Sequence, residues 1–274
     1  MVFEFHKVSN FGTTHPVVAR LGIQSNDLVG FINVDELRRD AIKKLYFDLM
    51  QRLLRCHEIR DGLMNGIREE VEKVTKQEHQ IREVPQVVGL QGVVEGFLYE
   101  TKNFLRDLLG LFEIVFVQKF EDASAFADFK GKGDSKVVKW AVKTVGKDDR
   151  LAQRLKSQQA WMSEVIGMRN AVEHPGGYSG SLVVHNIRRH PARRGAFISP
   201  TWRRVAGREA DIGSDMDSIL ANLLTVAEDL LAEMVTHRPC SPHIAVYEIP
   251  IQDRNPQSPV RLRIGLNQEL LGKS

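Results

Sequence analysis

The apolar positions of the chain have a helical period in its middle and a strand-like pattern at both ends. Residues 3–8 and 28–34 alternate or cluster apolar side chains as short strands do, so residues 1–34 are predicted to form a small β element. The helical period begins after Asp35, which is placed to cap a first long helix. The charged residues 58–83 either continue that helix or form an exposed connection. Its apolar residues recur at every fourth position: Leu37, Ala41, Leu45, Leu49 and Leu53.

Three further segments carry the helical period. Residues 91–116 have a broad apolar face, and residues 135–145 follow a candidate N-cap at Asp134. The third segment begins at Asp148 or Asp149. Glycines in or beside the first segment each cost about 1 kcal/mol relative to alanine, a cost usually found where a second helix approaches closely. The glycines at which close packing is expected are Gly89, Gly92, Gly96 and Gly110.

Strand patterns return after the third of these helices. Residues 182–187 and 196–205 predict a hairpin within residues 181–206. A last amphipathic helix follows, with Ser214 or Asp215 at its start.

Residues 243–249 and 260–264 predict two final strands, which can pair with those of the N-terminus. The fold class predicted is therefore mainly α, and α+β overall. Its parts are an N-terminal β element of residues 1–34 that packs on the main domain, a helical domain of residues 35–240 that includes the hairpin, and a C-terminal β element of residues 241–274.

Composition narrows the class of protein. A chain of 274 residues with 42% hydrophobic content buries about 70–75% of its unfolded surface, in one large domain or two small ones. No apolar stretch approaches the roughly 20 residues needed to cross a bilayer, and the N-terminus lacks a basic and then apolar signal layout. A cytoplasmic protein with no membrane partner is therefore expected.

Metal, disulfide and phosphate-loop motifs are not indicated. Cys56 and Cys240 are far apart and have no neighbouring ligand pairs, so no metal or cofactor is expected. The glycines of residues 130–133 lack the spacing of a phosphate loop, which disfavours a nucleoside triphosphatase.

The best candidate for a chemical site is the hexad of residues 169–174. Arg169, Asn170 and His174 lie at the end of a helical segment that must stop at Pro175, beyond which two glycines loosen the chain. Asn170 and His174 are one turn apart, in line with Ser163 and Gly167, whereas Arg169 is displaced toward the apolar stripe.

The bare spacing of Arg, four residues and His occurs at two other places in the chain. The copy from Arg52 to His57 lies in mid-helix without a polar companion, and the copy from Arg238 to His243 contains two prolines. Only the copy at Arg169 combines a preceding helix, a polar neighbour and a helix end.

The hexad resembles the motif of the HEPN superfamily, in which Arg and a polar residue precede a His on the last long core helix. Residues 99–105 also resemble an earlier core helix of these domains, and the resemblance covers residues 87–235. It implies a helical bundle that cleaves RNA without a metal. In that role Arg169 holds the scissile phosphate, Asn170 orients either His174 or the phosphate, and His174 transfers a proton near neutral pH.

Two further residues beside the hexad are candidates for supporting roles. Glu173 is placed to tune the His174 imidazole. In a toxin branch of the family, a Tyr two residues after the His is a modification target. The nearest tyrosine here, Tyr178, follows His174 by four residues and so departs from that pattern.

The predicted hairpin contains a local excess of positive charge. No acidic residue occurs between His185 and Arg208, and because the net charge of the chain is only +3, the seven arginines of this stretch leave −4 on the rest. Such a patch suits a phosphate backbone, with Phe197 and Trp202 as stacking faces for bases. A solvated hairpin, or one paired with acids of a second subunit, is the alternative. The arginines are Arg188, Arg189, Arg193, Arg194, Arg203, Arg204 and Arg208.

Three functions remain open at this stage. The first is a HEPN-type endoribonuclease, for which the resemblance implies a homodimer because one motif offers only one good titrating group. The second is a non-catalytic module that binds RNA or nucleotides, and the third is a structural protein whose motif seals a dimer interface. A separately encoded protein partner is compatible with each.

Overall fold

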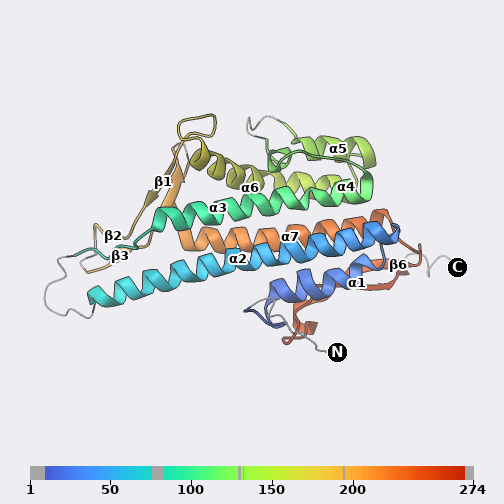
Figure 1. Ribbon diagram of the computed structural model, residues 1–274, viewed down its shortest axis with the longest axis horizontal. Coiled ribbons are helices and arrows are strands. Elements are labelled where there is room, and N and C mark those ends of the chain that lie inside the picture. Colours follow the sequence, from blue (N-terminus) through green and yellow to red (C-terminus); the bar gives the residue numbers. More distant parts are fainter. Residues whose placement is uncertain are drawn as a thin grey trace, which may run out of the picture.

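The computed structural model describes residues 10–75, 83–128, 131, 133–193, 195–205 and 207–268. It is a bundle of long helices with a β extension at one end and a small hairpin near the other (Figure 1). The mainly α class, α+β overall, is confirmed. The long helices are α2 (Glu36–Thr75), α3 (Leu90–Leu108), α6 (Arg150–Glu173) and α7 (Ile212–His237).

Helix α2 is the longest element and runs beside α7 and α3 (Figure 1). It continues through the charged residues as far as Thr75. The alternative in which residues 58–83 continue the helix is therefore correct up to Thr75. Its predicted apolar stripe is wrong at the start, because Leu37 is 84% exposed and Ala41 is exposed as well. A strict four-residue spacing advances about 400° and so drifts roughly 40° around the helix at each step. The residues that are buried include Ile42, Tyr46, Leu49 and Leu53.

The predicted helix of residues 91–116 is two helices. Helix α3 ends at Leu108, and α4 (Gly110–Phe116) begins after a turn at Leu109. Close packing is wrong at Gly89, Gly92 and Gly96, because a Cβ there would meet no described heavy atom within 4 Å. At Gly110, however, a Cβ would lie 3.8 Å from the Leu45 side chain.

The helix caps are only partly as predicted. Asp149 caps α6 by accepting the Leu151 N–H at 2.8 Å. Of the two predicted caps, Asp148 and Asp149, the second is therefore correct. Helix α5 (Lys136–Val145) is capped by Ser135 and not by Asp134, whose carboxylate instead pairs with Lys156.

The start of α7 also differs from the prediction. Its N-cap is Asp211, which accepts the Ser214 N–H at 2.8 Å. Asp215, one of the two predicted caps, instead accepts the Trp202 indole N–H at 2.7 Å.

The described part of the N-terminal region is helical, so the predicted strand at residues 28–34 is wrong. The π-helix η1 (Val18–Gln24) leads into α1 (Ser25–Val29), and only Ile32 forms a bridge, to Pro239. Leu28, Val29 and Ile32 are buried, and this burial requires apolar residues whatever their backbone conformation. The predicted strand of residues 3–8 lies outside the described residues.

The two C-terminal strands are confirmed and pair with each other. Strand β6 (Ile244–Glu248) is antiparallel to β7 (Leu262–Leu266), with the 3₁₀ turn η3 (Ile251–Asp253) between them. No strand of the N-terminal region pairs with either of them among the described residues.

The Arg-rich hairpin is confirmed and has an additional strand. Strand β1 (Leu182–His185) pairs with β4 (Thr201–Arg204), which also pairs with β5 (Ala210–Asp211). Further out, β2 (Arg188–Arg189) pairs with β3 (Phe197–Ile198). The β extension therefore begins after the turn that follows α6 and ends at the start of α7.

A buried ionic network on α7 holds three other segments. Glu228 and Glu233 are each 1% exposed and Asp229 is 6% exposed. Arg261, the residue before β7, binds Glu228, at 3.2 Å, and Asp229. The network joins α7 to α6 through Arg154 and to η1 through Arg20, with further bonds made by Gln24.

We expect Arg261→Ala to destabilise the fold by about 1.5–3 kcal/mol, because the buried Glu228 and Asp229 each lose one of their two arginine partners. Arg263→Ala is the matched control, since Arg263 is an exposed arginine two residues further along, in β7, and its loss should change stability by less than about 0.5 kcal/mol. Urea unfolding of both variants measures the difference. Equal stabilities would contradict the assigned role of the network.

The packing of His57 predicts a pH dependence of stability. Burial, and then the nearby His15, lower the pKa of His57 to about 4 from its ordinary 6.5. The neutral imidazole therefore contributes its full stability above pH 6.5, and this contribution is lost as the pH falls toward 4. We expect the loss of stability between pH 7 and pH 4.5 to be smaller in His57→Gln than in the wild type. His243→Gln, at an exposed position, should keep the wild-type slope.

Candidate functional site

Arg169 lies at the C-terminal end of α6 and is held by two contacts. Its guanidinium lies over the Tyr99 ring of α3, 5.4 Å from the ring centroid. Its Nη1 is 3.3 Å from the carboxylate of Glu173, one turn further along the helix. The side chain is 14% exposed, so this charge is fixed in direction near the surface.

A second cation, Lys102 of α3, meets the same carboxylate. Its Nζ donates to Asn170 Oδ1 at 3.0 Å and lies 3.7 Å from Glu173. Asp122 is 4.0 Å from the same nitrogen. Burial opposes ionisation of Asp122, but hydrogen bonds from Ser124 and the charge of Lys102 hold its pKa below the ordinary value. Two cations therefore converge on Glu173, whose side chain is 41% exposed.

His174 ends α6 and is exposed. Its N–H donates to the Asn170 carbonyl at 2.9 Å, and its imidazole makes no hydrogen bond or ion pair with another described residue. Its carbonyl accepts the Gly177 N–H at 2.9 Å. A Cβ at Gly177 would lie 3.0 Å from that carbonyl oxygen, so the turn favours glycine there.

The turn after His174 presents Tyr178. Gly180 donates to the Gly177 carbonyl at 2.9 Å, and Gly176 donates to the Gly180 carbonyl at 3.0 Å. These bonds close a tight loop whose tip is Tyr178 and Ser179. The Tyr178 side chain is 70% exposed.

The proposed stacking role of Trp202 is wrong. The side chain is 1% exposed, and its indole N–H donates to Asp215 at 2.7 Å. Its ring also packs near Phe97, with centroids 6.5 Å apart. Because β4 turns Trp202 into the core, its faces cannot contact a base.

Arg188 and Arg204 of the hairpin have carboxylate partners. Arg188 pairs with Glu209, the first residue beyond the acid-free stretch. Arg204 makes two bonds to Glu164 of α6, of 3.0 and 2.5 Å. Arg189, Arg193, Arg203 and Arg208 are exposed, and Arg194 lies outside the described residues.

Only part of the basic hairpin lies near α6. Arg204 lies against α6, because a Cβ at Gly167 of that helix would be 2.8 Å from Arg204 Nη1. Strands β2 and β3, which carry Arg188 and Arg189, lie at the far end of the β extension (Figure 1). The sequence-predicted site therefore divides into the cluster at the end of α6, with Arg204 beside it, and a separate basic tip.

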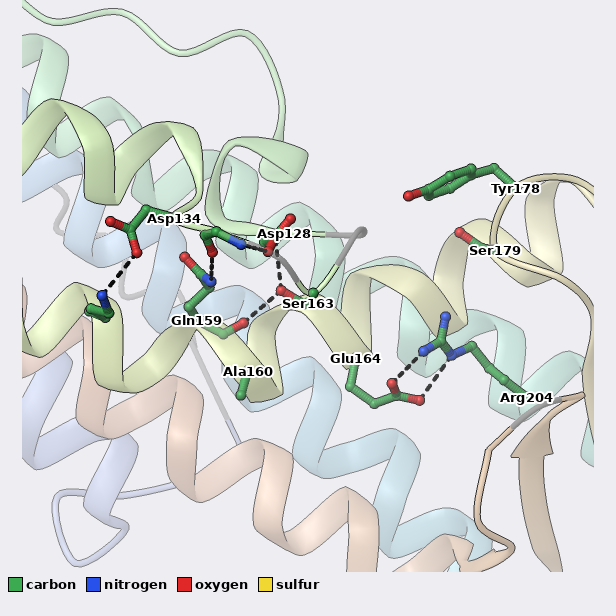
Figure 2. A pocket seen from close by; sticks show the side chains of 12 residues that line it. Asp128, Asp134, Gln159, Ala160, Ser163, Glu164, Tyr178, Ser179 and Arg204 are labelled. Atoms are coloured by element: carbon green, nitrogen blue, oxygen red, sulfur yellow. Dashed lines mark hydrogen bonds and ion pairs between the residues drawn. The ribbon is translucent and has the colours of Figure 1, made fainter.

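A cavity of about 640 Å³ lies beside Arg204, along the middle of α6 (Figure 2). Figure 2 shows Tyr178 and Ser179 on one side of it and Asp128 and Asp134 on the other. Ser163 and Glu164 of α6 form its floor. Nothing in the sequence pattern indicates this cavity, because its walls are far apart in the chain.

Sequence reasoning gave no role to Lys102 or Tyr99, although both contact the hexad. They are three residues apart on α3 and so share a helix face. The sequence does show a polar and an aromatic residue beside an otherwise apolar face of α3. It does not show that this face of α3 contacts the end of α6, so their partner could not be predicted.

Two general features of the described residues bear on function. No group of three or more His, Cys, Asp or Glu side chains among them could hold a metal ion. None of their helices combines the length and apolar character needed to cross a membrane.

Comparison of the chain with protein-family models gives no match, and neither the curated proteins nor the solved structures compared with it contain one. The chemistry of the site therefore has to be inferred from its own residues.

We expect Glu173→Gln to strengthen anion binding at the end of α6, because two cations would lose the carboxylate that they share. The variant should bind inorganic phosphate or a short RNA several-fold more tightly, with a steeper salt dependence. Stability should fall by less than about 1 kcal/mol, since Glu173 is partly exposed. Calorimetric titration checks this, with Glu209→Gln on the hairpin as the control. Similar gains in both variants would show that general charge, and not this site, is responsible.

Proposed function

We propose that the chain is a metal-independent endoribonuclease of the HEPN type that acts through Arg169, Asn170 and His174. The observation that carries the proposal is the convergence of two cations beside an exposed imidazole. Arg169 and Lys102 lie 3.3 and 3.7 Å from one surface carboxylate, and His174 is the next residue after it.

A HEPN-like bundle is part of the proposal. Helix α3 packs along α6, and the hexad ends α6, as the family order requires. The two helices also share the site, because α3 supplies Lys102 and Tyr99 to a motif that α6 carries.

A phosphodiester can take the position that Glu173 occupies. Both are anions with oxygen acceptors, and the fork of Arg169 suits either one. Glu173 is 41% exposed and can turn toward solvent, so exchange requires no change in the backbone. The Tyr99 ring keeps the guanidinium in place during the exchange. Charge that develops on the phosphate in the transition state then faces two fixed cations.

The reaction proposed is an internal transfer at phosphorus. The ribose 2′-oxygen forms a bond to phosphorus and loses its proton, and the bond from phosphorus to the 5′-oxygen breaks as that oxygen gains a proton. The products are a 2′,3′-cyclic phosphate and a 5′-hydroxyl, so no water, metal or redox partner is consumed. His174, with an imidazole at the surface, transfers one of the two protons.

The second proton requires a second group. We infer a homodimer in which the end of α6 from each copy faces one cleft, so that two imidazoles divide the acid and base roles. The exposure of both His174 and Tyr99 on one side of the bundle supports such a contact.

A structural role for the hexad is the competing proposal. Arg169 and Asn170 are already engaged within the chain, by Tyr99, Glu173 and Lys102, as residues that only join α3 to α6 would be. In that case Arg169→Ala would lower stability or weaken association without affecting any reaction. Non-catalytic RNA binding is a third outcome, in which His174 would have no effect.

The experiment that tests the proposal is cleavage of a mixed RNA pool in the presence of chelator. We expect the wild type to leave 2′,3′-cyclic phosphate ends and His174→Ala to be slower by at least about 10²-fold, the usual contribution of a general acid or base. Sequencing of the cleaved ends and light scattering of the same samples give the chemistry and the oligomeric state.

The matched control is His243→Ala. His243 is exposed and follows Arg238 with the same spacing, but it lies in a proline-containing loop. It should cleave at the wild-type rate. Absence of cleavage by a folded dimer, or equal rates for His174→Ala and the wild type, would overturn the nuclease proposal.

A further inference from the structure

The cavity beside Arg204 and the Asn170 position of the hexad lie along one face of α6. Ser163 lies on its floor, and Gly167 and Asn170 follow on the same helix face at intervals of three to four residues. Seven residues separate Ser163 from Asn170, a rise of about 10 Å along the helix. Arg204 lies over Gly167, between the cavity and the cluster. A ligand in the cavity would therefore be adjacent to an anion held at the hexad.

The turn that follows His174 also joins the two places. It is closed by the hydrogen bonds from Gly177 to His174 and from Gly180 to Gly177. Its tip, Tyr178, extends over the cavity (Figure 2). The same short loop therefore fixes the backbone positions from which the imidazole and an exposed aromatic ring extend.

The lining of the cavity combines aromatic, cationic and acidic groups. Tyr178 offers a ring, and the cations Lys156 and Arg204 lie toward opposite ends of the cavity along α6. Asp128 is fixed in place, because its carboxylate accepts the Gly133 N–H at 2.8 Å and its own N–H donates to Ser163 Oγ at 3.0 Å. A carboxylate accepts about four hydrogen bonds, so Asp128 can serve a ligand as well.

We propose that this cavity binds one nucleotide of single-stranded RNA next to the phosphate held at the hexad, and that it prefers guanine. The inference rests on the proposed function and adds the substrate preference of the same site. A ring, flanking cations and an open groove are the features by which proteins bind single strands. The volume of about 640 Å³ lies within the range of about 300–1,000 Å³ typical of small-ligand sites.

The preference for guanine follows from the acidic wall. Carboxylates recognise bases by accepting N–H groups, and guanine presents two neighbouring donors on its Watson–Crick edge, which a single carboxylate can accept together. Asp128, which accepts the Gly133 N–H and donates to Ser163, is the acceptor assigned to this edge. The base stacks on Tyr178, and Arg204 lies beside the phosphate that leads to the hexad.

The test is calorimetric titration of the His174→Ala protein with each of the four nucleoside 5′-monophosphates, which have no internucleotide bond to cleave. The guanosine nucleotide should bind at least fivefold more tightly than the uridine nucleotide. Tyr178→Leu should weaken its binding about tenfold, the scale of one lost stacking contact. Tyr178→Phe is the matched control and should bind as the parent does. Because Tyr178 is 70% exposed, neither change should disturb folding.

Asp128→Asn should remove the preference between bases while stacking on Tyr178 remains. If the substitution loosens the loop, the comparison of Tyr178→Leu with Tyr178→Phe still decides the question. Equal affinities for all four nucleotides, or unchanged binding by Tyr178→Leu, would overturn the proposal.

These titrations, compared with the RNA cleavage experiment, separate this proposal from the proposed nuclease activity. Cleavage by the wild type without any preference for guanine next to the cut would overturn the subsite and leave the nuclease in place. Selective binding of the guanosine nucleotide by a protein that cleaves no RNA would overturn the nuclease and leave the cavity as a nucleotide site.

Discussion

Three carboxylates of α7 are buried in the bundle, and the arrangement of the molecule depends on how their charges are paired. Glu228, Asp229 and Glu233 receive arginines from segments far apart in the chain. A buried ion without a partner costs several kcal/mol, so each arginine has to dock for the core to be stable. The N-terminal helical region, α6 and the C-terminal hairpin thus all pack on α7 in a way that neutralises the same group of buried carboxylates. Apolar burial contributes most of the free energy of this packing.

The candidate site depends on this requirement through α6. Arg154 ties the first turns of that helix to Asp229 and Glu233, and the Asp149 cap also contacts His237 at 3.1 Å. At the other end, α6 is attached to α3 by the bond of Asn170 with Lys102. A helix of 24 residues fixed at both ends holds its side chains in a constant direction. The hexad and the floor of the cavity are therefore placed on a rigid element, which is where a reactive site needs to be.

Sequence periodicity was sufficient for the long helices and for the hairpin, because each has many turns or strand pairs that repeat one pattern. It failed where a single residue decides the outcome. Leu28, Val29 and Ile32 are apolar because they are buried, and burial alone does not distinguish a strand from a helix. Asp134 was plausible as a cap, yet Ser135 is adjacent and equally suited, and the choice depends on where Lys156 lies.

The site shows the same limit. The motif at Arg169, Asn170 and His174 could be identified from local spacing, whereas the partners Lys102 and Tyr99 depend on which face of α3 meets α6. Trp202 was assigned to the surface because it lies among arginines, but alternation along β4 turns it inward while its neighbour Arg203 is exposed. A count of charged residues cannot distinguish a side chain that points into the core from one that points to solvent.

The arginine pairs change where a nucleic acid would bind. As a sequence, the hairpin is the most basic stretch of the chain. In the fold, Arg188 is paired with Glu209, and Arg204 is turned toward Glu164, on the wall of the cavity. An ion pair at the surface is weak and exchanges readily, so Arg204 can leave Glu164 for a phosphate just as Arg169 and Lys102 can leave Glu173. Positions where a cation is held in place by a replaceable carboxylate thus run along α6 from the cavity to His174. Under the proposed function, this line, more than the tip of the hairpin, would hold the single strand.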